Sequence, residues 1–436
     1  MVLRSPVLYR RIATAALLTL AVAASGGCKQ SLFEDGAGDD PDVVGTTCPA
    51  ECLGDAARDF QAATPKRGWR YVEDRRNRTW VPMTAASKRA VGEDPANGFT
   101  TCADKPGAAA CAALPGALLV STAGGSSAAD PALEFTVTSK RVAKLGVRVL
   151  VPADAPEQQL RIYRNSREDS LFTGSAAAGT LLEQVVSADV LPGDRLLLAF
   201  APASGGATDI GVELFISDVG TPSSCKIGLT FDGATGNTVT NACGAAFTSY
   251  QYQDVGDDTE VPPTLGPGPF MELGQAAVIA PGKYYKGLEV PSKAGDVTLQ
   301  FWMQAKTVNE IYGSYAYSDH DLDNTGGVSV DLYSPGRVII ESLSCTRVNG
   351  GAGGYAGTFV DYPNSTTWQF VRLVHTGSKV TLCINNKQAL NYALPGGKLT
   401  SSYPPYLGKN VKWSPGAFFD GAMDDVRLLS TALPCE

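Results

Sequence analysis

The closing stretch of the chain restricts the possible fold more than any other feature of the sequence. A turn at Asp420-Gly421 leads into a run in which Val426 and Leu428 can point to one side of an extended strand. Asp425 and Arg427 then point to the other side, which is typical of a β-strand that buries one face. Other strand-like segments occur at residues 131–137, 145–151, 159–163, 190–200, 210–216, 227–233, 297–303, 368–375 and 379–387. The sequence therefore predicts an all-β fold.

Length and composition favour two domains. The chain has 436 residues, which suits two domains with extensions, and it is rich in Gly (47) and Pro (27) while only 18% of its residues are charged. This composition favours short strands joined by turns. With a linker at Thr221–Ser224, we expect two β-sandwich (jelly-roll) domains, at residues 48–220 and 225–436. Residues 86–129, rich in Ala, Gly and Ser, are expected to form a long insertion with one strand at 117–120.

The N-terminus has the features of an export signal. Three arginines (Arg4, Arg10 and Arg11) precede a short apolar core at residues 12–24, which is too short to span a bilayer. The small residues that follow lead directly to a cysteine, Cys28. Small residues before a cysteine resemble the bacterial lipobox.

We therefore expect residues 1–27 to be a lipoprotein signal peptide and Cys28 to carry the lipid. This anchor would hold the protein on a bacterial membrane of the cell envelope, at the outer membrane or cell surface. Ser25 departs from the motif, which usually has Leu at that position. The alternative is ordinary cleavage after Ala23, which would release a secreted protein.

The segment after the cysteine is expected to be a tether. Residues 28–47 contain five acidic side chains and few large apolar ones, too few to offset the entropy of ordering the segment, so we expect a disordered acidic tether. The net charge of the whole chain is −8, and beyond the short basic run at residues 75–78 no cluster of Lys and Arg stands out. Nucleic acid is therefore not an expected partner.

Four segments of the C-terminal half resemble the laminin-G-like, or concanavalin A-like, lectin/glucanase superfamily. They are the Phe-Asp-Gly at residues 231–233, the core strand that contains Trp302, the hairpin at 368–387 and the closing Asp-Asp-Val-Arg-Leu at 424–428. The resemblance implies a concanavalin A-like sandwich over residues 225–436. More loosely, the pattern around Phe60, Trp69, Tyr71 and Gly193-Asp194 resembles the jelly-roll modules of secreted bacterial proteins.

The cysteines of an exported chain are expected to form disulfides. Candidates in the N-terminal domain are Cys48, Cys52, Cys102 and Cys111; a four-thiolate zinc site is the alternative for these residues. In the family the first and last strands of the sandwich are antiparallel neighbours, so the resemblance favours a Cys225–Cys435 bridge that joins the two ends of the domain. The competing arrangement is Cys225–Cys243, which leaves Cys435 for Cys383 or Cys345.

A run of alternating carboxylates could hold a metal. Asp319, Asp321 and Asp323 stand at every second position, and carboxylate oxygens are the ligands that calcium prefers. The run is not an EF-hand loop, because Asn324 and Val330 occupy positions where that loop needs Gly and Glu. Calcium is therefore the candidate cofactor, and a polar hairpin turn is the alternative.

Aromatic residues near this run are candidate ligand-binding residues. Tyr315 and Tyr317 precede the carboxylates, and Tyr355 and Trp413 lie in loops rich in Gly, Ser and Pro, as do Tyr362, Tyr403 and Tyr406. Exposed rings can stack on the apolar faces of sugars, as in many lectin-like sites. Packing beneath long loops is the alternative for each of these rings.

These features favour binding over catalysis. Glycoside hydrolases of this fold need paired carboxylates, which usually occur as E-x-D-x-x-E or E-x-D-x-E, and neither pattern occurs in the chain. The sequence also lacks the G-x-S-x-G and H-E-x-x-H motifs. We therefore predict a non-catalytic cell-surface binding module for a glycan or a surface protein. The alternative is a structural or adhesive surface protein without a small ligand; a glycoside hydrolase is the least favoured.

Overall fold

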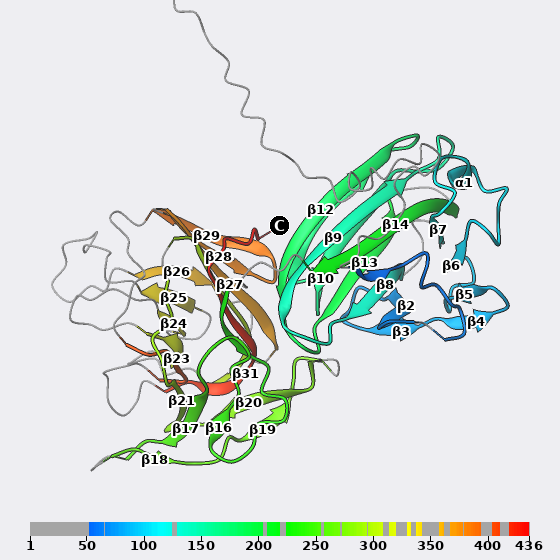
Figure 1. Cartoon of the computed structure of the whole chain (residues 1–436). Helices are drawn as coiled ribbons and strands as arrows, with labels where there is room; N and C mark the ends of the chain where they lie inside the picture. The colour runs from blue at the N-terminus through cyan, green and yellow to red at the C-terminus, as the bar shows by residue number, and fades with distance from the viewer. Residues whose placement is uncertain are drawn as a thin grey trace, which may run out of the picture.

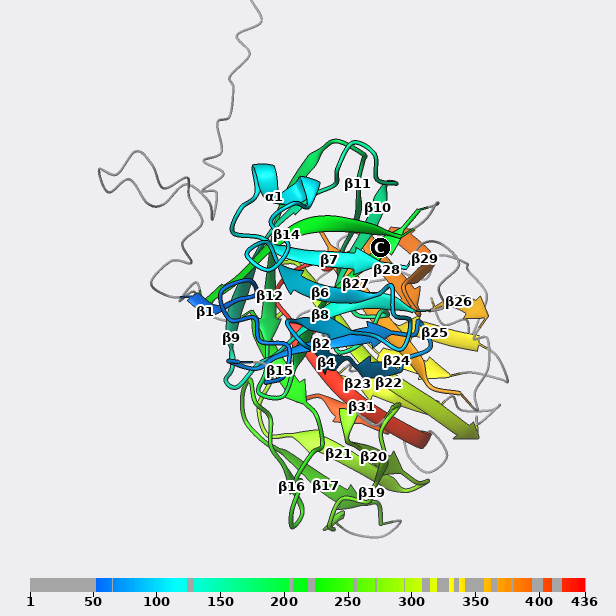
Figure 2. The same cartoon turned by 90° about the vertical axis from the view of Figure 1, so that its right-hand side faces the viewer.

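The computed structural model shows an almost all-β protein made of two pairs of antiparallel sheets (Figures 1 and 2). The structure describes residues 52–64, 66–123, 129–203, 207–218, 224–253, 257–270, 273–293, 295–307, 314–319, 329–332, 337–341, 357–361, 367–377, 379–393, 403–409 and 418–435. The predicted signal peptide, Cys28, the tether and linker positions 221–223 lie outside this set. No helix in the described part of the chain is long and apolar enough to cross a membrane.

The N-terminal domain contains two of the sheets, A and B, built from residues 52–218. Sheet A has the order β12-β9-β14-β7-β6-β5-β4, with β1 paired to β14. Its strands are β1 (Cys52–Asp55), β4 (Thr84–Ala86), β5 (Arg89–Val91), β6 (Gly98–Thr101), β7 (Leu118–Thr122), β9 (Arg141–Leu150), β12 (Leu181–Val190) and β14 (Thr208–Asp218). A short helix, α1 (Ala109–Ala113), lies between β6 and β7.

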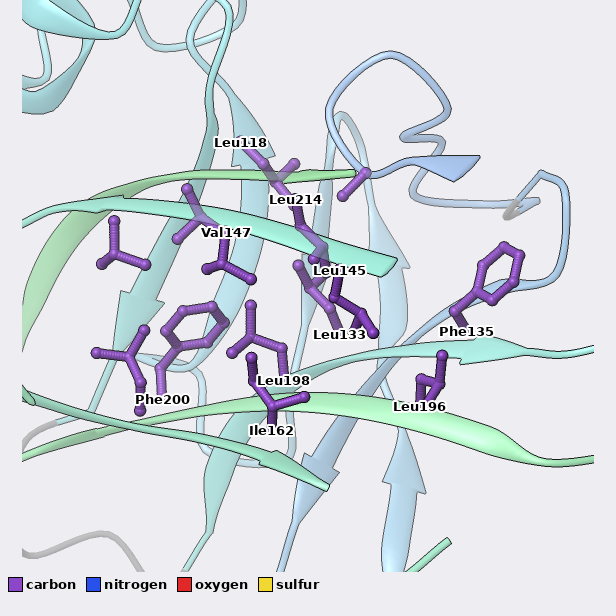
Figure 3. Close-up of a cluster of buried hydrophobic side chains, with 14 of the residues drawn as sticks. Leu118, Leu133, Phe135, Leu145, Val147, Ile162, Leu196, Leu198, Phe200 and Leu214 are labelled. Carbon is purple, nitrogen blue, oxygen red and sulfur yellow. The ribbon is translucent and has the colours of Figure 1, made fainter. Parts of the chain in front are cut away.

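Sheet B completes the N-terminal sandwich, with the order β11-β10-β13-β8-β2-β3. Its strands are β2 (Trp69–Asp74), β3 (Trp80–Pro82), β8 (Asp130–Thr136), β10 (Gln158–Arg164), β11 (Ser170–Ala176) and β13 (Arg195–Pro202). Alternate residues of both sheets point inward and meet in one core, where Val147 and Leu214 from sheet A face Leu198 and Phe200 from sheet B (Figure 3). The period-two alternation of the sequence therefore fixes which face of each strand is buried.

The C-terminal domain contains the other two sheets, C and D, built from residues 225–429. Sheet C has the order β19-β20-β31-β22-β27-β28-β29, with β15 also paired to β31. Its strands are β15 (Cys225–Leu229), β19 (Leu265–Pro267), β20 (Gln275–Ile279), β22 (Val297–Thr307), β27 (Gln369–Thr376), β28 (Lys379–Ile384), β29 (Lys387–Ala393) and β31 (Asp420–Leu429).

Sheet D has the order β16-β17-β21-β30-β23-β24-β25-β26, with β18 paired to β17. Its strands are β16 (Thr238–Val239), β17 (Phe247–Gln251), β18 (Thr259–Glu260), β21 (Lys283–Gly287), β23 (Ser314–Ser318), β24 (Ser329–Leu332), β25 (Arg337–Glu341), β26 (Gly357–Asp361) and β30 (Tyr406–Leu407). The core between C and D contains Val426 and Leu428, as their alternation in the sequence predicts.

The disulfides correct one expectation from the sequence. The first and last strands of the domain do pair antiparallel, with Cys225 opposite Leu429. The predicted Cys225–Cys435 bridge is nevertheless wrong, because Cys225 is bonded to Cys243 and Cys435 to Cys383. In the N-terminal domain Cys102 is bonded to Cys111, so the alternative of a four-thiolate zinc site is also wrong. Cys52 begins β1, and Cys48 lies outside the described residues.

Cys435 bonds to Cys383 instead of Cys225 because of the path that the chain takes after β31. Its last residues cross the outer face of sheet C instead of ending beside β15. The Thr298 hydroxyl donates to the carbonyl of Thr431 at 2.7 Å and accepts from the amide of Leu433 at 3.0 Å. Arg372 then donates to the carbonyl of Pro434 at 2.5 Å. The chain thus passes over β22 and β27 and reaches β28, where Cys383 lies.

The two domains pack through the outer faces of sheets B and C. Phe270 of the C-terminal domain lies between two tryptophans: its ring centroid is 5.5 Å from that of Trp80 in sheet B and 5.7 Å from that of Trp302 in sheet C. The guanidinium carbon of Arg78, from the β2–β3 turn, lies 4.7 Å from the centroid of the Trp302 ring. This contact buries one outer face of each sandwich.

Two buried ion pairs cross the same interface. Arg427 on β31 donates to both carboxylate oxygens of Asp194, at 2.5 and 2.8 Å, and to Asp425 at 2.6 Å. Arg372 on β27 donates to Asp169 at 2.6 Å. All of these side chains are almost fully buried. Burial acts to raise the pKa of Asp194, but Arg427 more than offsets this and holds that pKa below its usual value.

Candidate functional site

The outer face of sheet D points away from the N-terminal domain (Figure 1). On this face three tyrosines from neighbouring strands form a row: Tyr250 on β17, Tyr284 on β21 and Tyr406 on β30. The ring centroids of Tyr250 and Tyr284 are 5.4 Å apart with 17° between the ring planes, and those of Tyr284 and Tyr406 are 5.7 Å apart with 28° between the planes. We call these three residues the tyrosine ladder.

The alternation of each strand places the ladder on the outer face. Phe247, Tyr285 and Leu407 point into the core between sheets C and D. The tyrosines that stand an odd number of positions away in the same strands must then point outward. The register brings them together, since Tyr250 lies directly opposite Tyr284 and the neighbouring Lys286 lies opposite Tyr406.

A second group of side chains surrounds the ladder. The Tyr252 ring packs against Phe418, with centroids 5.3 Å apart. The Lys409 ammonium lies 5.0 Å from the centroid of Tyr252 and 4.5 Å from that of Tyr284, so it sits between two rings. Lys409 also forms an ion pair with Asp258 at 3.4 Å. Cation–π contacts of this kind stabilise the arrangement of the rings.

Hydrogen bonding at Asp258 fixes the protonation states in the site. The Tyr284 hydroxyl donates to Asp258, and burial followed by this contact with the carboxylate raises the pKa of Tyr284 well above its ordinary value. Burial also acts to raise the pKa of Asp258, but the hydrogen bonds from Tyr284 and from the amide of Gln253, with the nearby Lys409, hold it below the usual value. At neutral pH the site therefore contains a neutral tyrosine and a charged aspartate.

The side chains of the site differ in how much of their surface is exposed to a ligand. Tyr284 and Tyr406 are only 3% and 9% exposed, whereas Tyr250 and Tyr252 are half-buried and leave part of each ring at the surface. Lys286 is also half-buried, and its ammonium lies 5.7 Å from the centroid of Tyr406. Among the described residues Lys286 has no carboxylate partner. The site thus offers ring surface, hydroxyl groups and one ammonium group.

The comparison with family models identifies the domain that contains most of this site. Residues 283–436, which include Tyr284, Tyr406, Lys286 and Lys409, match the family described as the concanavalin A-like lectin/glucanases superfamily. The C-terminal domain is a concanavalin A-like domain. The resemblance read from the sequence is confirmed. No curated protein matches the chain.

Solved structures resemble the chain at low identity. One is domain 4 of AbnA, a GH43 extracellular arabinanase from Geobacillus stearothermophilus, in complex with arabinotriose: 14% identity, TM-score 0.37, covering 49% of this chain and 96% of that one. Another is the binding domain of botulinum neurotoxin DC in complex with rat synaptotagmin II, with 10% identity, a TM-score of 0.33 and 49% of each chain covered. The chain therefore spans about half the length of this neurotoxin structure.

The aromatic residues predicted from the sequence are not the ones that form the ladder, apart from Tyr406. Tyr317 is fully buried in the core of the concanavalin A-like domain, where its ring cannot reach a ligand, so its prediction as a binding residue is wrong. Tyr315 lies on β23, beside it. Tyr355 and Trp413 lie outside the described residues.

The predicted calcium ligands are only partly within the described chain. Asp319 is fully buried, forms an ion pair with Lys293 and accepts a hydrogen bond from the Tyr317 hydroxyl at 2.7 Å. In this structure the Asp319 carboxylate is therefore paired with Lys293, and the calcium site stays a prediction. Asp321 and Asp323 lie outside the described residues. Across the described ranges no group of three or more His, Cys, Asp or Glu side chains could hold a metal ion.

Proposed function

We propose that the protein is a non-catalytic glycan-binding module of the bacterial cell envelope, and that Tyr250 of the tyrosine ladder, together with Tyr252 and Lys286, contacts the glycan. The observation that carries this proposal is the aromatic row on an outer face that the N-terminal domain leaves free. Sugar rings have apolar C–H faces that pack on aromatic rings and hydroxyl groups that pair with polar side chains. Tyr250, Tyr252 and Lys286 supply both kinds of contact.

The lipid anchor is part of the same proposal. The small residues before Cys28 and the acidic segment after it support attachment to a membrane through a tether. Replacing Cys28 with alanine is expected to move the exported protein from the membrane fraction to soluble material. A wild-type protein that is already soluble and begins at Ala24 would contradict the anchor without affecting the glycan site.

The glycan proposal is tested with the full chain carrying Cys28→Ala, screened on a glycan array. We expect at least one class of glycan to bind. Replacing Tyr250 and Tyr252 together with alanine should weaken that binding by on the order of tenfold per ring, because aromatic contacts contribute about 0.5–1.5 kcal/mol beyond the area they bury. The affinity of each variant for the selected glycan is measured by isothermal titration calorimetry.

The control is Phe172→Ala, which removes a half-buried ring from β11 of the N-terminal domain. It should leave the affinity for the glycan unchanged, and the melting temperature of each variant shows whether it is folded. A folded wild-type protein that binds no glycan on the array would contradict the proposal. So would a selected glycan that binds the Tyr250/Tyr252 variant as tightly as the wild type.

A further inference from the structure

A lysine and an aspartate are buried together in the concanavalin A-like domain. Lys293 lies in the connection between β21 of sheet D and β22 of sheet C, and Asp319 directly follows β23 of sheet D. The Lys293 ammonium contacts Oδ2 of Asp319, and the two side chains are 1% and 0% exposed. Lys293 is the only buried lysine in the part of the chain that the structure describes. The glycan-binding proposal uses neither residue.

A lysine in this position can do chemistry that the buried arginines cannot. Taking an ammonium and a carboxylate out of water costs free energy that their mutual attraction offsets only in part. One proton transfer inside the pair converts it into a neutral amine beside a neutral carboxylic acid. A neutral, desolvated lysine is a nucleophile that attacks carbonyl carbons. The guanidinium groups of Arg372 and Arg427, in the ion pairs between the domains, stay protonated and are excluded from this reaction.

Tyr317 is the third group at this position. Its hydroxyl donates to Oδ2 of Asp319 at 2.7 Å, and its ring is fully buried in the core between sheets C and D. Burial, followed by the neighbouring carboxylate, raises the pKa of Tyr317 well above its ordinary value, so the hydroxyl stays a hydrogen-bond donor at neutral pH. A donor on this oxygen stabilises the negative charge that develops there when a nucleophile adds to Cγ of Asp319.

We propose that Lys293 and Asp319 form an intramolecular isopeptide bond, an amide between Lys293 Nζ and Asp319 Cγ. After proton transfer within the ion pair, the neutral amine adds to Cγ while Tyr317 stabilises the charge on Oδ2. The nitrogen then passes one proton to the Oδ1 hydroxyl, the Cγ–Oδ1 bond breaks and one water leaves, and Oδ2 becomes the amide oxygen. An ammonium and a carboxylate thus give an amide and water, and no other reactant is needed.

The fold supplies the conditions for this condensation. Holding two groups in contact makes the reaction intramolecular, with an effective concentration of about 10⁵–10⁸ M for well-oriented groups. Because both side chains are closed off from solvent, the reverse hydrolysis lacks its water. The bond joins the segment that enters sheet C to the end of a strand in sheet D, at a sequence separation of 26. Unlike a disulfide, it does not open under reducing conditions.

A second group of the same three residue types provides an internal control. Lys409 pairs with Asp258 at 3.4 Å, and Asp258 also accepts a hydrogen bond from the Tyr284 hydroxyl. The Lys409 and Asp258 side chains are 12% and 21% exposed, so water reaches both charged groups. Hydration keeps such a pair ionised, and an ammonium is not a nucleophile. We therefore expect no amide between Lys409 and Asp258.

The proposal is tested on the full chain carrying Cys28→Ala, reduced and unfolded before mass spectrometry. The wild-type protein should be lighter than its processed sequence by the mass of one water. After digestion with trypsin, the peptide that contains Asp319 should be recovered joined to the side chain of Lys293, with no cleavage after Lys293. Cleavage after Lys409 should be complete.

Two variants test the roles of the groups. Lys293→Arg keeps the positive charge but cannot form the amide, so it should have the full mass of its sequence. Tyr317→Phe should lower the cross-linked fraction of freshly made protein on the order of tenfold, because it removes the donor on Oδ2. Tyr285→Phe is the matched control, since it removes the hydroxyl of another buried tyrosine that faces the same core. It should leave the cross-linked fraction unchanged.

A folded wild-type protein that has the full mass of its sequence, and that trypsin cleaves after Lys293 as completely as after Lys409, would overturn the proposal. A loss of water that persists in Lys293→Arg, or that maps to other residues, would also overturn it. If Lys293→Arg does not fold, the peptide map of the wild type alone decides. Equal cross-linked fractions in Tyr317→Phe and Tyr285→Phe would overturn the role assigned to Tyr317.

Discussion

Replacing Arg427 with methionine should lower the free energy of unfolding by about 3–5 kcal/mol, because it removes one partner of a buried ion pair. The guanidinium bonds both oxygens of Asp194 in the other domain and one oxygen of Asp425 in its own strand. Without it two carboxylates stay buried with no cation between them. The change is measured by guanidinium unfolding, followed by tryptophan fluorescence and by circular dichroism. The two probes should coincide in the wild type and separate in the variant, because the domains lose one of the two buried ion pairs that join them.

The control for Arg427 is Arg75→Met. Arg75 pairs with Glu93 at the surface, where the two side chains are 39% and 61% exposed, so its loss should cost at most about 1 kcal/mol. If Arg427→Met does not fold, Asp194→Asn tests the same pair and keeps one acceptor. A cost for the Arg427 variant that is no larger than the control would mean that the pair does not join the domains.

The sign of the pH dependence follows from the lowered pKa of Asp194. A carboxyl whose pKa is lower in the folded protein stabilises it above the unfolded value, about 3.9. This contribution is lost as the pH falls through the lower, folded pKa. The difference in stability between wild type and Asp194→Asn should therefore be largest at neutral pH and shrink in acid.

Many of the longer strands were predictable from the sequence because alternation shows which face of a strand is buried. The segments at 145–151 and 210–216 match β9 (Arg141–Leu150) and β14 (Thr208–Asp218). The region predicted as an insertion, 86–129, contains three strands, β5, β6 and β7, of which only β7 was predicted. Short strands rich in Ala and Gly carry little alternation, and pairing with their neighbours in sheet A decides their conformation.

The role of the polar face of the closing strand could not be predicted. Alternation places Asp425 and Arg427 opposite the core, but a sequence pattern does not show whether water or another domain covers that face. Here the N-terminal domain covers it, and Asp425 adopts a φ of 46° at a bulge opposite the Gln300–Trp302 segment of β22. Such a conformation is uncommon for a residue other than glycine. The bulge adds one residue to β31 and changes the direction in which the neighbouring side chains point.

The tyrosine ladder was missed for a related reason. Tyr250 and Tyr284 stand in alternating segments, so each could have been assigned to an outer face. The ladder depends on the pairing of β17 with β21, and on the pairing of β21 with β30, which is more than 100 residues further along the chain. Single-sequence reasoning does not give that register. It directed attention to the Tyr317 region, where the ring faces inward.

Replacing Cys383 and Cys435 together with serine should cost about 4 kcal/mol of unfolding free energy, because their disulfide closes a loop with a sequence separation of 52. The same chain-entropy relation gives about 3 kcal/mol for Cys225–Cys243, with a separation of 18, which makes that pair the control. The measured cost for Cys383–Cys435 should exceed the entropy value. This disulfide also holds the chain end on sheet C, where the Pro434 carbonyl accepts from Arg372.

Losing that carbonyl would leave a buried guanidinium nitrogen of Arg372 with one strong acceptor fewer, and Arg372 is the residue that bonds Asp169 across the domain interface. The disulfide therefore supports both the C-terminal domain and its contact with the N-terminal one. Peptide mapping without reduction should recover Cys383 linked to Cys435 and Cys225 linked to Cys243. A peptide that joins Cys225 to Cys435, or a smaller cost for the Cys383/Cys435 variant than for the Cys225/Cys243 variant, would contradict this account. In both cases the chain end would be free of sheet C, and Arg372 would need another acceptor.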